Sequence, residues 1–80
     1  MVHGSIVRSL AGHDKNDFQV VIKAEDDFVY VCNGKSRRLE RPKKKNLKHV
    51  KKLNTVLDDE CLKSNKSIRL ALSSFAKEPA

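Results

Sequence analysis

Three short apolar segments follow one another at the start of the chain, separated by polar turn residues. Residues 4–11 (GSIVRSLA) interleave apolar and polar side chains, and residues 18–24 (FQVVIKA) and 28–32 (FVYVC) are rich in β-branched and aromatic residues. This pattern is typical of strands, and the polar connections 12–17 and 25–27 are typical of turns. A chain of 80 residues buries only about 60% of its unfolded surface, so these strands must share one small domain.

An Asn-Gly pair, Asn33 and Gly34, follows the third segment. Both residue types tolerate the positive φ of a type I′ turn, so the pair predicts a hairpin. Residues 36–40 would then return as a fourth strand paired with residues 28–32. Pro42 cannot donate to a sheet, so this strand should end just before it or lie at an edge.

Residues 46–53 place Leu47 and Val50 among Lys and His side chains, which fits either a short fifth strand or a helical turn. Short strands at such close spacing favour a closed barrel, because closure removes exposed edges. The expected fold class is therefore mainly β, a small barrel with one short C-terminal helix.

The composition changes after residue 53, where four basic and four acidic residues leave residues 54–80 with a net charge of 4 − 4 = 0. Ser64 is a candidate N-cap, and Ile68, Leu72 and Phe75 recur on one helical face. These features predict an amphipathic helix over about residues 65–76. The expected organisation is a barrel over residues 1–53 with a helical appendage over residues 54–80.

Positive charge is concentrated in residues 35–52, which hold ten Lys or Arg and a single acid, Glu40, or 10 − 1 = +9. The whole chain is +7, so the remainder sums to 7 − 9 = −2. So dense a block needs an anionic partner, and phosphate of nucleic acid is the leading class. No strong apolar face accompanies it, as membrane binding would require. The chain has no apolar run of about 18 residues and no signal-peptide pattern, so we expect a cytoplasmic protein.

Catalysis and cofactors have little support in the sequence. Cys32 and Cys61 lie 61 − 32 = 29 positions apart, without the spacing of a metal site, and are expected to behave as small hydrophobic residues. His13 and Asp14 lack a third catalytic group, and the acidic clusters lack the spacing of a metal loop. We expect that the chain is not an enzyme, and that it binds no cofactor and no small-molecule substrate.

The apolar alternation of residues 6–10, the turn with Gly12 and the second alternation of residues 18–22 are followed by NGKSRRLERPKKKNLKHV. In these residues the chain resembles the KOW family, and specifically bacterial relatives of a KOW-containing large-subunit ribosomal protein of archaea and eukaryotes. Where that family often has a second Gly, this chain has Asn16, the residue that best replaces Gly in a left-handed conformation. The resemblance implies an SH3-like barrel that binds RNA, with ribosomal RNA as the leading candidate and ribosomal proteins as further partners.

Arginine can grip phosphate with two hydrogen bonds or stack on an exposed base, whereas lysine acts as a point charge. Phe18, Phe28 and Tyr30 are expected in the core, so recognition should depend on RNA shape and phosphate. If Arg37 and Arg38 lie on a strand, they point to opposite faces. The predicted RNA-binding residues are Gly12, His13, Lys15, Lys35, Arg37, Arg38, Arg41, Lys43, Lys44, Lys45 and Lys48, with Lys51 and Lys52 adding charge.

A protein-interaction module is the alternative function. Barrels of the SH3 type also dock protein segments, and the apolar stripe of residues 65–76 would then bind a partner. If the helix packs on the barrel instead, that stripe is part of the core.

Overall fold

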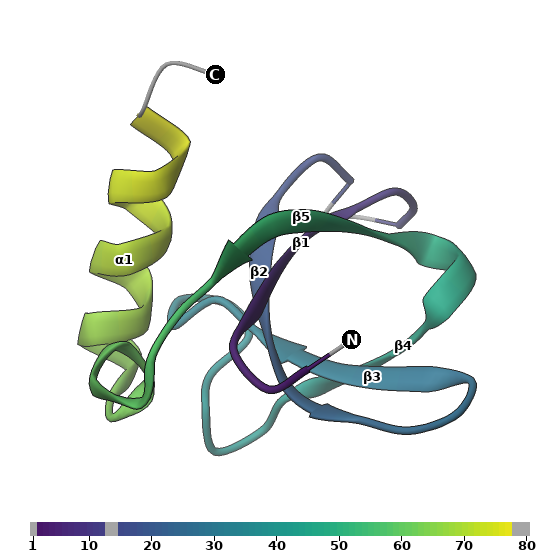
Figure 1. The fold of residues 1–80 in the computed structure, drawn as a ribbon, viewed down its shortest axis with the longest axis horizontal. Helices are drawn as coiled ribbons and strands as arrows, with labels where there is room; N and C mark the ends of the chain where they lie inside the picture. Colours follow the sequence, from purple (N-terminus) through teal and green to yellow (C-terminus); the bar gives the residue numbers. More distant parts are fainter. Residues whose placement is uncertain (1, 13–14, 78–80) are drawn as a thin grey trace.

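The strand pattern of the sequence forms a five-stranded antiparallel sheet with the order β4-β3-β2-β1-β5 (Figure 1). The structure is a computed structural model, and it describes residues 2–12 and 15–77. Among these residues there is one α-helix, α1 (Asn65–Lys77), which lies along one side of the sheet. The strands are β1 (Ser5–Ser9), β2 (Phe18–Ala24), β3 (Phe28–Cys32), β4 (Lys43–Asn46) and β5 (Val50–Val56).

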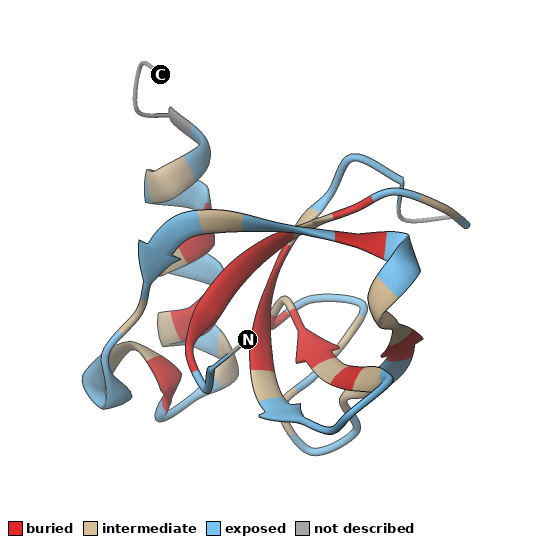
Figure 2. Ribbon diagram, turned by 45° about the vertical axis from the view of Figure 1, so that its right-hand side comes forward, coloured by how far each residue is buried: buried red, intermediate tan, exposed pale blue. Residues whose placement is uncertain are grey.

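The central strands are buried on both faces, which explains their nearly continuous apolar sequences. On the helix side, Ile6 and Val20 join a core with Ile68 of α1. On the other side, Val7 and Val31 join a second core inside the curved sheet. Figure 2 shows this burial running along β1 and β2. The predicted strands over residues 18–24 and 28–32 are confirmed, and β1 lies within the predicted residues 4–11.

The predicted hairpin at the Asn-Gly pair is wrong, because residues 36–40 form no strand. Among the described residues, Gly34 has a positive φ of 78° and Asn33 does not, so the type I′ geometry is not formed. The strand that pairs with β3 is β4, which begins directly after Pro42, with Tyr30 opposite Lys44. Pro42 therefore precedes a strand instead of ending one, and residues 33–42 form a wide loop.

The two edge strands are joined by three residues, the 3-10 helix η1 (Leu47–His49). So short a link between opposite ends of the strand order requires the sheet to curl strongly. Both interpretations of residues 46–53 are therefore right in part, since a helical turn leads into β5. Within residues 2–12 and 15–77 no ladder joins β4 to β5, so the curled sheet is not closed as a barrel.

The helix packs on the sheet through the predicted apolar stripe. Ile68 and Leu72 are buried, and the ring of Phe75 meets that of Phe18 edge-on at 5.3 Å between centroids. Ser64 caps the helix, because its Oγ accepts a hydrogen bond from the Ser67 N–H at 3.1 Å. The stripe is thus occupied by the chain's own sheet, and the predicted division at residue 53 falls inside β5.

Helix docking can be tested with two leucines two positions apart on α1. Leu72 is 6% exposed and Leu70 is 56% exposed. We expect Leu72→Ala to lower the free energy of unfolding by roughly 2–5 kcal/mol, because it leaves a cavity in the helix-side core. The control Leu70→Ala should change it by no more than about 0.5 kcal/mol. Urea denaturation of both variants measures the difference, and equal effects would mean that the helix is not docked.

Candidate nucleic-acid interface

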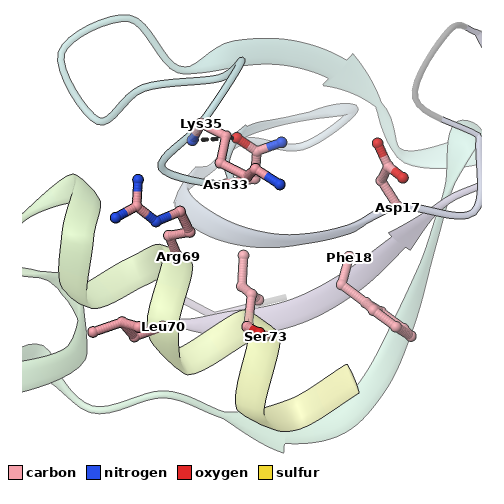
Figure 3. A pocket seen from close by; sticks show the side chains of 8 residues that line it. Asp17, Phe18, Asn33, Lys35, Arg69, Leu70 and Ser73 are labelled. Carbon is pink, nitrogen blue, oxygen red and sulfur yellow. Dashed lines mark hydrogen bonds between the residues drawn. The ribbon is translucent and has the colours of Figure 1, made fainter. Parts of the chain in front are cut away.

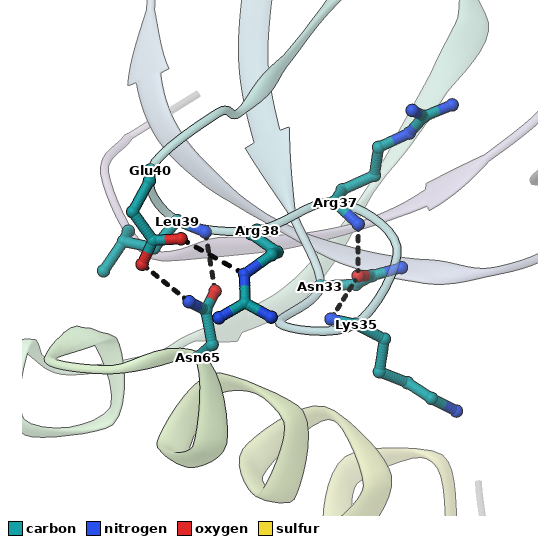
Figure 4. A network of polar contacts seen from close by, with 7 residues as sticks. All are labelled: Asn33, Lys35, Arg37, Arg38, Leu39, Glu40 and Asn65. Atoms are coloured by element: carbon teal, nitrogen blue, oxygen red, sulfur yellow. Dashed lines mark hydrogen bonds and ion pairs between the residues drawn. The ribbon is translucent and has the colours of Figure 1, made fainter.

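The side chain of Asn33 organises the first half of the loop between β3 and β4 (Figure 4). Its Oδ1 accepts hydrogen bonds from the backbone N–H groups of Lys35 at 2.8 Å and Arg37 at 3.0 Å. The carbonyl oxygen of Arg37 in turn accepts from the N–H groups of Asn33 and Gly34. The turn is thereby fixed at both ends, which sets the directions in which Lys35 and Arg37 leave the backbone.

The second half of the loop is held by Asn65, the first residue of α1. Its Oδ1 accepts from the Leu39 N–H at 2.6 Å, and its Nδ2 donates to Oε1 of Glu40 at 2.8 Å. Oε2 of Glu40 accepts from Nε of Arg38 at 3.3 Å. The hydrogen bond from Arg38 is the main reason why the pKa of Glu40 lies below its ordinary value. The one acid of the basic segment therefore fixes the loop.

The loop and the start of β4 surround a hollow of about 520 Å³. Four cationic side chains line it together with a hydroxyl and a proline ring, and none of the described residues that line it carries a carboxylate. Because residues 36–40 are a loop, Arg37 and Arg38 line the same hollow, contrary to the expectation for a strand. We call this site the arginine hollow, and it consists of Ser36, Arg37, Arg38, Arg41, Pro42 and Lys43.

The three consecutive lysines of β4 have different positions because side chains alternate along a strand. Lys44 is exposed, and its Nζ lies 4.2 Å from the ring centroid of Phe28. Lys45 is 7% exposed, and its Nζ donates to Oγ of Ser9 at 2.5 Å and to the carbonyl oxygen of Ala11 at 3.4 Å. Lys45 faces the inside of the curved sheet, so its predicted role in phosphate binding is withdrawn.

The connection between β1 and β2 has the predicted left-handed positions, with φ 86° at Gly12 and φ 73° at Asn16. Gly12 and Lys15 are exposed, and His13 lies outside the described residues. Lys48 is exposed on η1, near the β2–β3 connection, where the Leu47 N–H donates to the carbonyl oxygen of Asp27. Lys48 is thus separate from the arginine hollow in the fold.

Sequence reasoning missed Arg8, which lies on β1 outside the basic segment. Its Nε is buried and has no hydrogen-bond partner among the described residues, and Arg8 lies opposite Lys51 of β5. Like charges directly across a sheet repel, and a buried donor without a partner is costly, so an anion here would relieve both. The signal in the sequence was the alternation of Ile6 and Arg8, which places an arginine on a core face.

The two thiols have different surroundings, since Cys32 is buried and Cys61 is half-buried. Burial raises the pKa of Cys32 to about 11, and a hydrogen bond with Asp58 is the main cause that raises the pKa of Cys61. Both cysteines are free. In the part of the chain that the structure describes, no group of three His, Cys, Asp or Glu residues could hold a metal ion. None of the helices described here is long and apolar enough to cross a membrane.

The exposed cations at this end of the molecule come from the β3–β4 loop, from β4 and from the β1–β2 connection. Within the β3–β4 loop, the backbone from which these cations extend is ordered by hydrogen bonds to Asn33 and Asn65. Comparison of the chain with models of known protein families and with curated proteins finds no match. The functional interpretation therefore depends on the geometry and charge of the site itself.

The role of Glu40 can be tested by titration. In the native protein its carboxyl should titrate below the ordinary value of 4.5, so its contribution to folding is complete above about pH 4.5 and disappears as the pH falls through the lower native pKa. Removing the Arg38 side chain (Arg38→Ala) should move the native midpoint up toward 4.5. Carboxyl NMR signals measure this shift, with Arg41→Ala as the control. Equal shifts in the two variants would refute the specific pairing.

Proposed function

We propose that this chain is an RNA-binding domain whose main phosphate contact is the arginine hollow. The observation that carries the proposal is the arrangement of four cations around one hollow, with no carboxylate among the described residues that line it. Planar guanidinium groups donate pairs of parallel hydrogen bonds to phosphate oxygens, and an ordered loop presents them without first paying for its own ordering. Lys35 and Lys44 flank the hollow in sequence and are exposed.

We further propose an SH3-like barrel of the KOW type as the finer description of the fold. Two features support it. The short η1 link between the edge strands gives a strongly curled sheet, and β1 lies between β2 and β5. In the β1–β2 connection, Gly12 and Asn16 both have positive φ, as two glycines would in a KOW loop. On this basis the RNA is structured, ribosomal RNA in the cytoplasm is the leading candidate, and ribosomal proteins are neighbouring partners.

Charge reversal in the hollow is the direct test. We expect the double variant Arg41→Glu, Lys43→Glu to bind RNA much more weakly than the native chain. The control Lys23→Glu, Lys66→Glu changes two exposed lysines outside the hollow, alters net charge by the same 2 × 2 = 4 units and should retain binding. Fluorescence anisotropy with a labelled RNA measures both. Equal losses would mean that only the overall charge matters.

The salt dependence of binding reports the number of phosphate contacts. About four contacts on a single strand predict a log–log slope near −0.7 × 4 ≈ −2.8, or roughly a fifty-fold loss of affinity between about 50 and 200 mM salt. Removing two contacts with the hollow variant should reduce the slope by about 1.4. Binding that does not change with salt would contradict the proposed mechanism.

Association with the ribosome is a separate expectation. In a sucrose gradient of cell lysate at low salt, the native protein should migrate with the large subunit and be released at high salt, because the contacts are electrostatic. The hollow variant should remain at the top, and the Lys23, Lys66 control should migrate with the subunit. If the native protein also remains at the top, the RNA partner is not ribosomal.

A further inference from the structure

A second pocket, of about 410 Å³, lies between α1 and the other side of the β3–β4 loop (Figure 3). We call it the helix groove. The side chain of Arg69 extends from α1 toward the turn that carries Lys35, and Asp17 lies at the far side. Its apolar surface comes from Phe18, whose ring is held by Phe75, and from two leucines of α1. Asp17, Phe18, Lys35, Arg69 and Ser73 are among the residues that line the groove.

The helix groove and the arginine hollow share one turn. Lys35 lines the groove, whereas the next two residues, Ser36 and Arg37, line the hollow. Oδ1 of Asn33 binds the N–H groups of both Lys35 and Arg37, so the two sites are fixed relative to each other. A nucleotide whose phosphate binds in the hollow therefore has a second, partly apolar pocket beside it.

We propose that the helix groove binds one unstacked base of a single-stranded RNA element whose backbone lies in the arginine hollow. This inference rests on the proposed RNA binding. Unstacked bases stack on arginine planes and on apolar or aromatic side chains, and Arg69 and Phe18 supply such surfaces. The volume of the groove falls in the usual range of small-ligand pockets, about 300–1,000 Å³.

The polar groups of the groove favour guanine. The Asp17 carboxylate only accepts hydrogen bonds, and the edge of guanine offers it two adjacent donors, N1–H and the N2 amino group. Lys35 and Arg69 only donate, and they match the O6 and N7 acceptors of the same base. Uracil has a single ring donor, so it satisfies the carboxylate less well. The bound base is therefore guanine in preference to uracil.

The test uses the full chain and three labelled single-stranded RNAs: a run of uridines with one central guanosine, the same RNA with an abasic site there, and the run of uridines alone. We expect the native protein to bind the guanosine RNA about tenfold more tightly than the abasic RNA, because stacking of one base contributes about that much. Asp17→Asn should reduce the preference for guanosine over uridine.

Two exposed neighbours on α1 provide a matched pair of variants. Ser73 lines the groove and Ser74 does not. Ser73→Phe should fill the groove and remove the tenfold difference, and Ser74→Phe should preserve it. Arg69→Lys keeps the charge but loses the stacking plane, so it should reduce the difference in affinity between guanosine RNA and abasic RNA. Melting curves establish that each variant is folded.

The outcomes separate this inference from the proposed function. If the native protein binds guanosine and abasic RNA equally, or if the two serine variants behave alike, the base pocket is refuted and phosphate binding stands. The groove would then be a site for a peptide or for no ligand. If neither single-stranded RNA binds while the labelled RNA of the charge-reversal test still binds, the base pocket fails and the proposed function stands. If no RNA binds, or if binding does not respond to salt, both the proposed function and the base pocket fail.

Discussion

The close approach of Gly34 to the backbone of α1 is the contact on which the rest of the molecule depends. A Cβ at this position would overlap the carbonyl oxygen of Asn65 and reach the backbone nitrogen of Arg69, and the φ of 78° disfavours any L side chain. Because the loop and the helix touch there, Asn65 reaches the Leu39 N–H and Glu40. Because Gly34 has no side chain, the helix can pack against the loop, and this packing determines the shape of the loop and the positions of its arginines.

The curled sheet also contains a buried cation, which constrains its interior. Burying an ammonium is costly unless its donors are satisfied, and Nζ of Lys45 donates to Ser9 and Ala11 at the end of β1. This contact connects β4, an edge strand, to the start of the β1–β2 connection across 45 − 9 = 36 positions of sequence. Lys45 therefore stabilises the curled shape of the sheet by linking β4 to the end of β1.

The sequence predicted the elements better than their connections. The strands β2 and β3 and the capped helix carry strong local patterns, and the structure confirms them. The Asn-Gly pair misled because Gly34 serves a contact with a helix some thirty residues later, which local turn chemistry does not encode. The burial of Lys45 could not be predicted, because three consecutive lysines give no alternation of apolar and polar residues from which to tell the inner face of the strand. Arg8 and Arg69 were missed because they lie outside the dense segment that drew attention to the site.

The cost of gathering cations explains why the loop is so thoroughly hydrogen-bonded. Four like charges around one hollow repel each other, and Glu40 is the single acid within residues 35–52 that opposes them. Asn33 and Asn65 hold the backbone from both ends, so the repulsion does not open the loop. In the proposed RNA complex, a phosphate would meet side chains that leave an already ordered backbone, so less binding energy would be lost in ordering the loop. The same hydrogen bonds fix the backbone of Lys35, which lines the helix groove, so the folded loop sets where the backbone of this charged residue lies beside the apolar surface of the groove.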